Sequence, residues 1–230
     1  MYYYRPNYRF ASHKGRPVTI AVLFKAEDVW GAAAAAQRIN GEYLKGDKFD
    51  PQDTSKVIAR ANRSIVHDFL QTPALISDED KAAGAEVRRY YHSFSFKLLS
   101  DAFISDFDRS AIKIAEKEEL SSNLDIAIVA SLPSCAERGR ARDANQSRIK
   151  FAQGGFIGKV GDKVTADIEV LKCVFSHNWN VFFVTGITSD DKALFFSFKE
   201  KVEIGAKMTI KGTVKAHRDD STQLTRVKVL

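Results

Sequence analysis

The chain has 230 residues, which is enough for one large domain or two small ones. Hydrophobic residues make up 44% of it, which excludes a globally disordered protein, and the net charge is +6. This charge is uneven, with +3 on residues 1–50, −3 on residues 51–133 and +6 on residues 134–230. A basic region beside an acidic one suggests a polyanion partner, although a surplus of this size also serves solubility alone.

The cysteines and the apolar runs bear on the cellular compartment. Cys135 and Cys173 lie far apart and in no metal-binding spacing, which argues against a disulfide framework or a zinc site and fits a reducing environment. No apolar run approaches the ~20 residues that span a bilayer. The N-terminus lacks the apolar core of a signal peptide. The sequence therefore predicts a cytoplasmic protein.

Residues 1–133 predict a mainly helical region with an N-terminal arm. The arm, residues 1–17, is rich in Tyr, Arg and Pro. It either packs on its own domain or places rings and guanidinium groups on bases and phosphates. Residues 18–24 form an apolar segment or short strand, and residues 42–52 a surface loop. Apolar periodicity and capping residues predict helices over residues 27–39, 53–70, 77–100, 105–120 and 123–132.

Residues 134–157 differ in character and predict a basic linker or loop, because residues 134–150 have no core-forming period. This stretch has the densest local excess of arginine in the chain. A flexible basic loop beside a binding domain can close over a phosphate backbone. A plain linker with solubilising charge is an equal alternative. The basic residues concerned are Arg138, Arg140, Arg142, Arg148 and Lys150.

Residues 158–230 predict a five-stranded β-barrel. Apolar and polar residues alternate, and Gly, Asn and Asp fall at the breaks. The first strand is long enough to bend and serve both halves of a barrel. The whole chain is therefore predicted to be α+β, with an N-terminal helical region before a C-terminal barrel. The predicted strands cover residues 163–175, 179–188, 193–199, 208–217 and 222–229.

The pattern of these strands resembles the OB-fold. The segment VEIGAKMTIKGTVKAH, followed by TQLTRVKVL, is similar to the fourth and fifth strands of such folds, and NVFFVTGITSDDKALFFSF to the second and third. The connection before the fourth strand is too short for the helix that is common there. With its helical region, the chain also resembles phage-encoded single-stranded-DNA-binding proteins, which implies the host-cell cytoplasm. It ends in RVKVL, where many of these proteins have an acidic tail.

Motifs of enzyme chemistry are missing from the sequence. A phosphate-binding loop at residues 153–160 would need Gly in place of Gln153 and Ser or Thr in place of Val160. The five histidines show no metal-binding spacing. Asp167 and Glu169 share one strand face, but no further acidic motif accompanies them. We expect no cofactor and no enzymatic activity; a metal-dependent nuclease would need a carboxylate cluster assembled by the fold.

The predicted function is the binding of single-stranded nucleic acid in replication, recombination or repair, with DNA favoured and RNA as the alternative ligand. Such ligands are held by aromatic rings that stack on bases and by basic side chains along the phosphates. The alternative is a protein-interaction module that docks on a replication or recombination protein without binding DNA. The candidate aromatic contacts are Trp179, Phe182, Phe196, Phe175 and His177. The candidate basic contacts in the barrel are Lys172, Lys192, Lys211, Lys215, Arg218, Arg226 and Lys228, beside those of residues 134–150.

Overall fold

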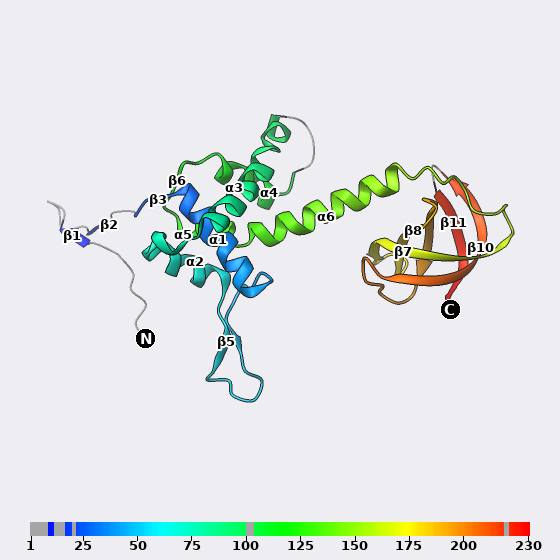
Figure 1. The fold of residues 1–230 in the computed structure, drawn as a ribbon, viewed down its shortest axis with the longest axis horizontal. Coiled ribbons are helices and arrows are strands. Elements are labelled where there is room, and N and C mark those ends of the chain that lie inside the picture. The colour runs from blue at the N-terminus through cyan, green and yellow to red at the C-terminus, as the bar shows by residue number, and fades with distance from the viewer. Residues whose placement is uncertain (1–8, 12–16, 20–21, 100–103, 219–220) are drawn as a thin grey trace. The chain divides into compact units, whose positions relative to one another are not determined.

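The computed structural model describes residues 9–11, 17–19, 22–99, 104–218 and 221–230. The chain forms two compact units, Met1–Arg138 and Gly139–Leu230, and the division falls inside helix α6 (Leu132–Lys150). Helices dominate the first unit, and the second contains a closed five-stranded β-barrel (Figure 1). The α+β fold class and the C-terminal barrel are therefore as predicted.

The first unit is organised around α1 (Ala26–Asn40), whose alanine-rich surface is almost entirely buried. A Cβ atom added at Gly84 of α3 (Asp78–His92) would lie 2.4 Å from the backbone carbonyl carbon of Trp30 in α1, so the two helices touch along their backbones. The helices are α1 (Ala26–Asn40), α2 (Asn62–Gln71), η1 (Pro73–Leu75), α3 (Asp78–His92), η2 (Ser95–Leu99), α4 (Asp106–Ala115) and α5 (Asn123–Val129). The short strand pairs are β1 (Arg9–Ala11) with β2 (Pro17–Thr19), β3 (Phe24–Lys25) with β6 (Glu119–Leu120), and β4 (Lys48–Phe49) with β5 (Val57–Ala59).

Helix ends in this unit follow the capping chemistry of the sequence. Gly41 ends α1 in the left-handed conformation (φ 70°), and its N–H donates to the carbonyl of Gln37. Ser77 and Ser105 cap α3 and α4 by accepting hydrogen bonds from the N–H groups of Asp80 and Asp108. These local signals explain why the starts of α3 and α4 are predictable from sequence.

The predicted helix over residues 53–70 is wrong in its first half. Val57–Ala59 forms β5 and pairs with β4, and α2 begins only at Asn62. The buried Asn62 side chain accepts hydrogen bonds from the N–H of Leu44 and the side chain of Asn40, which fixes the chain at the base of this hairpin. Apolar residues recur at every fourth position from β5 into α2. This spacing alone therefore did not show where the strand ends and the helix begins.

The loop predicted over residues 134–150 is also wrong, because these residues belong to α6, the helix in which the two units meet in sequence. The segment has no apolar stripe, but its alanines, arginines and glutamine are strong helix formers. Its C-terminal half packs on the barrel. The Arg148 guanidinium donates to both Glu169 carboxylate oxygens at 2.9 and 3.0 Å, and the Asn145 amide donates to the carbonyl of Leu171.

The barrel is built from β7 (Lys163–Ser176), β8 (Val181–Thr188), β9 (Ala193–Phe198), β10 (Lys207–Arg218) and β11 (Ser221–Val229). Its strand order is β10-β11-β9-β8-β7, closed by pairing of β10 with β7. The β9–β11 pair is parallel and the others are antiparallel. The arrangement is OB-like. The long first strand pairs with the second and the fourth, as its predicted length implied.

The segment between α6 and β7 is fastened to three places on the barrel. The Gly154 N–H donates to the carbonyl of Asp191 in the β8–β9 turn, and the Ile157 N–H donates to the buried hydroxyl of Thr222 in β11. The Gly161 N–H donates to the carbonyl of Val214 in β10. Residues 151–162 are thus an integral part of the barrel unit.

Candidate nucleic-acid interface

Phe196 is not an available stacking surface, contrary to its selection from the sequence. It is 1% exposed and packs among the buried residues of the barrel core. Turning it outward would lose about 1.5–3 kcal/mol of burial, as much as stacking on a base provides, about 1–3 kcal/mol. The prediction is therefore corrected: Phe196 supports the fold.

Three other predicted aromatic residues gather at the end of the barrel where β7 turns into β8. The Phe175 ring lies 4.9 Å from the rings of both His177 and Phe182, centroid to centroid. Phe182 packs partly against the barrel core, whereas Phe175 is 38% exposed and His177 is exposed. Trp179, in the turn itself, is 73% exposed, the largest value among the large hydrophobic residues described. The structure therefore brings these predicted residues together.

Two phenylalanines that were not among the aromatic contacts predicted from the sequence lie on the outer surface of β8 and β9. Successive side chains of a strand point to opposite faces, and Val184 and Phe196 point into the core. Phe183 and Phe195 therefore point outward, where their rings stack at 5.6 Å with an interplanar angle of 27°. Both are partly exposed. A stacked, partly uncovered pair of this kind presents flat apolar area to solvent.

Strand register adds an apolar and a basic side chain to this pair. Val174 of β7 lies opposite Phe183 and is 47% exposed. Lys172 lies opposite Thr185, which in turn lies opposite Phe195, so the three form one row across β7, β8 and β9. We call Phe183, Phe195, Val174 and Lys172 the aromatic face. A phosphate could lie beside Lys172 while a base covers the rings.

Two predicted basic contacts are occupied by carboxylates. Lys192 Nζ lies 2.6 Å from Asp190, and hydrogen bonds from Lys192 and Thr188 lower the pKa of Asp190 to about 2. Arg148 is held by Glu169, and its hydrogen bonds lower the pKa of that carboxyl group. Both cations are therefore less available to phosphates than the sequence suggests.

The remaining predicted basic residues lie in different parts of the chain. Arg138 is in the first unit, where its guanidinium contacts the Cys135 thiol at 3.4 Å. Arg140, Arg142 and Lys150 are exposed on α6 in the second unit. In the barrel, exposed basic side chains lie on β10 and β11: Lys211, Lys215, Arg218, Arg226 and Lys228.

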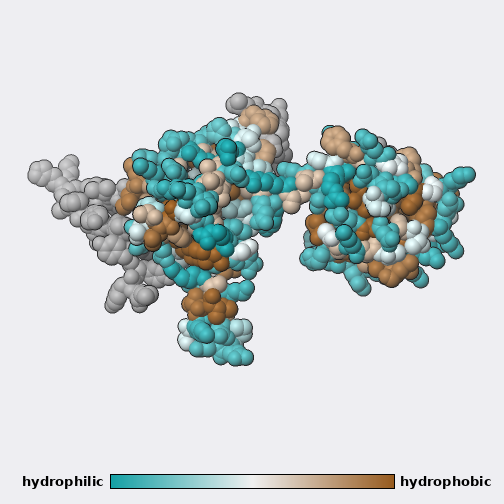
Figure 2. Space-filling view, viewed as in Figure 1, coloured by the Kyte–Doolittle hydropathy of each residue, from teal (hydrophilic) through white to brown (hydrophobic). Residues whose placement is uncertain are grey.

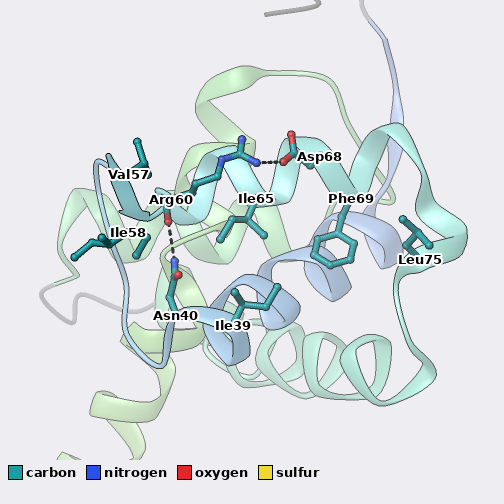
Figure 3. Close-up of a pocket in the computed structure, with 10 residues that line it drawn as sticks. Ile39, Asn40, Val57, Ile58, Arg60, Ile65, Asp68, Phe69 and Leu75 are labelled. Atoms are coloured by element: carbon teal, nitrogen blue, oxygen red, sulfur yellow. Dashed lines mark hydrogen bonds and ion pairs between the residues drawn. The ribbon is translucent and has the colours of Figure 1, made fainter. Parts of the chain in front are cut away.

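The helical unit carries a separate apolar groove of about 550 Å³ between the end of α1, α2, β5 and η1 (Figure 3). Ile39, Ile58 and Leu75 line it and are each more than half exposed. Arg60 and Asp68 form an ion pair at its rim. The base of the β4–β5 hairpin appears as an apolar area on the surface (Figure 2). This groove could receive an apolar side of another molecule.

Within the described residues, no helix is long and apolar enough to cross a bilayer. No three His, Cys, Asp or Glu side chains among those residues gather as a possible metal site. No protein family, curated protein or solved structure matches the chain.

Proposed function

We propose that the barrel binds single-stranded nucleic acid, DNA in preference to RNA, in replication, recombination or repair. The observation that carries the proposal is the stacked, partly exposed Phe183–Phe195 pair on the outer surface of β8 and β9. In OB-folds the face of the second and third strands, with the loops after the first and fourth, binds oligonucleotides. β8 and β9 are the second and third strands of this barrel.

Residues in and beside two turns of the barrel, Trp179 and Arg218, add stacking area and positive charge to this surface. Trp179 lies four residues before Phe183, so at most ~14 Å of chain separates them. Its exposed indole can stack on a base of any sequence. Arg218 ends β10 beside the turn after the fourth strand. The barrel thus offers stacking at the centre and positive charge at the edges, which favours unpaired bases and little sequence preference.

Intrinsic tryptophan fluorescence tests this function directly. The chain has two tryptophans, Trp30, which is buried in the helical unit, and Trp179. A base that stacks on Trp179 should quench its emission during titration with single-stranded DNA at low salt. Replacing Phe183 and Phe195 together by Leu keeps apolar cover but removes stacking. It should weaken affinity by about 5- to 150-fold for each stacked base lost, from ~1–3 kcal/mol per base.

The control replaces Phe156, which is 47% exposed, is not part of the aromatic face, and makes a tilted ring contact with His217 of β10 at 4.4 Å between centroids. Phe156→Leu should leave affinity unchanged. Equal affinity for duplex and single-stranded DNA, or no binding at low salt, would refute the proposal. Single-stranded RNA of the same sequence serves as the comparison for the preference for DNA.

The apolar groove favours a second candidate function, docking on a protein of the same process. Elongated apolar grooves receive the apolar side of an amphipathic helix. The double variant Ile58→Ser, Leu75→Ser should abolish co-purification of a polymerase, nuclease or helicase while leaving DNA affinity intact. If the wild-type chain and this variant retain the same partners, the groove has no such role.

A further inference from the structure

The outer surface of β7, β10 and β11 carries a cluster of exposed basic side chains. Lys211 of β10 lies directly opposite Lys228 of β11. Lys163 of β7 lies opposite Thr213, the next outward residue of β10. Arg226 is exposed two residues before Lys228. We call Lys163, Lys211, Arg226 and Lys228 the cation track.

Carboxylates do not neutralise this track within the part of the chain that the structure describes. None of its four side chains forms an ion pair there, whereas Lys192, Lys201 and Arg148 of the same unit each do. The outward acids of β7 have other partners. The Thr209 hydroxyl donates to Asp167, and Arg148 holds Glu169. The positive charge of the track is therefore directed to solvent.

The register makes this arrangement unfavourable for the barrel by itself. Side chains that lie directly opposite on neighbouring strands are about 4.5–5.5 Å apart at Cβ, and like charges there are destabilising. Lys211 and Lys228 are such a pair. Both could lower their repulsion by binding one anion between them.

The backbone shows a second unfavourable feature at the same place. β11 has one extra residue opposite Gly212, because Lys211 pairs with Lys228 but Thr213 pairs with Thr225. Arg226 lies in this bulge with φ 54°, the left-handed region in which glycine is favoured. Non-glycine residues in such conformations cluster at binding sites, where a bulge re-aims a side chain. The bulge holds an arginine where the backbone alone would favour glycine.

We propose that the cation track binds the phosphates of a nucleic-acid strand whose bases lie on the aromatic face. The inference rests on the proposed function and adds the path of the strand. β11 lies between β9 and β10, and Arg226 follows Gln223, the partner of Phe195, by three residues, so the track begins one strand spacing across and ~10 Å along β11 from Phe195. Gln223, opposite Phe195, and Thr225 are the polar residues on the way. A strand of a few nucleotides occupies the aromatic face alone, and a longer strand reaches both.

Two oligonucleotide lengths separate these contacts, about 4 and about 16 nucleotides, the limits of the usual site size per OB-fold. The double variant Lys211→Gln, Lys228→Gln should lower the slope of log K against log salt for the longer strand by about 1.4, or ~0.7 for each phosphate contact. Its affinity for the short strand should equal that of the wild type. Thermal melting checks that this variant is folded, and we expect no loss of stability.

The matched control is Lys192→Gln, Lys201→Gln, which removes the same charge from side chains already paired with carboxylates. An equal slope change in both double variants, or an unchanged slope in Lys211→Gln, Lys228→Gln, would overturn the inference. If the wild type binds neither oligonucleotide, the proposed function fails separately. Binding of inorganic polyphosphate then tests whether the cation track binds phosphates. Binding by the wild type that is lost in Lys211→Gln, Lys228→Gln supports the inference, and no binding by the wild type overturns it.

Discussion

Replacing Arg226 by glycine should stabilise the barrel and weaken nucleic-acid binding at the same time. The left-handed conformation costs a non-glycine residue about 1–2 kcal/mol, and Arg226 adopts it with φ 54°. Glycine removes that strain but loses about 0.5–1 kcal/mol through its greater freedom in the unfolded chain. The net gain is about 0.5 kcal/mol, or roughly a two-fold rise in hydrogen-exchange protection of β10 and β11 amide groups.

Hydrogen exchange suits this measurement because it reports the barrel unit separately from the helical unit. The same variant should lower the salt slope for the longer oligonucleotide by about 0.7, one phosphate contact. Arg226→Lys is the control, because it keeps both the charge and the strain, and should change neither quantity. A loss of exchange protection in Arg226→Gly would refute the reasoning, since it would mean that the arginine side chain supports the fold.

Three further predictions concern stability. Gly84→Ala should destabilise the helical unit by about 1–3 kcal/mol in denaturant unfolding, since the added methyl group meets the backbone of α1; an unchanged midpoint would contradict this contact. Phe196→Ala should lower the stability of the barrel by about 3–5 kcal/mol, whereas Phe195→Ala should mainly affect binding; equal losses would contradict their opposite orientations. Hydrogen bonds from Arg38 lower the pKa of the buried Asp80 carboxyl group below its ordinary value. The ionised Asp80 carboxylate therefore stabilises the fold above its unfolded pKa, and this contribution is lost as pH falls through the folded pKa. The melting temperature of Asp80→Asn should depend less on pH below about 4 than the melting temperature of the wild type. A wild-type melting temperature that does not fall in this range would contradict it.

The strands of the barrel could be predicted almost to the residue because alternation and turn residues are local signals. The face on which each aromatic lies was harder to predict. In the pairs Phe182–Phe183 and Phe195–Phe196, either residue can face outward in a strand. The residues predicted from the sequence as contacts, Phe182 and Phe196, are the inward members. A signal was present: Thr185 and Ser197 share the phase of Phe183 and Phe195 along their strands. Polar residues in the same phase indicate the solvent side.

The helical unit was less predictable where tertiary contacts decide. Residues 57–59 keep a helical apolar spacing, yet pairing with β4 and the hydrogen bonds of Asn62 make them a strand. Residues 134–150 have no apolar periodicity, so the intrinsic helix propensity of their side chains was the only sequence signal for α6. The cation track depends on the β10–β11 register and on a bulge at Arg226. Neither is specified by residues close in sequence.

The bonds between residues 145–161 and the barrel determine where the protein can be divided. A fragment that begins at Gly158 would lose the Arg148–Glu169 pair and the N–H donors of Gly154 and Ile157. Glu169 and the buried Thr222 hydroxyl would lose these partners. A recombinant barrel intended for crystallisation or for fusion to another protein should therefore begin near Gly139. The C-terminal half of α6 and the barrel should be transferred together, and a fusion that contains the barrel strands alone should fold poorly.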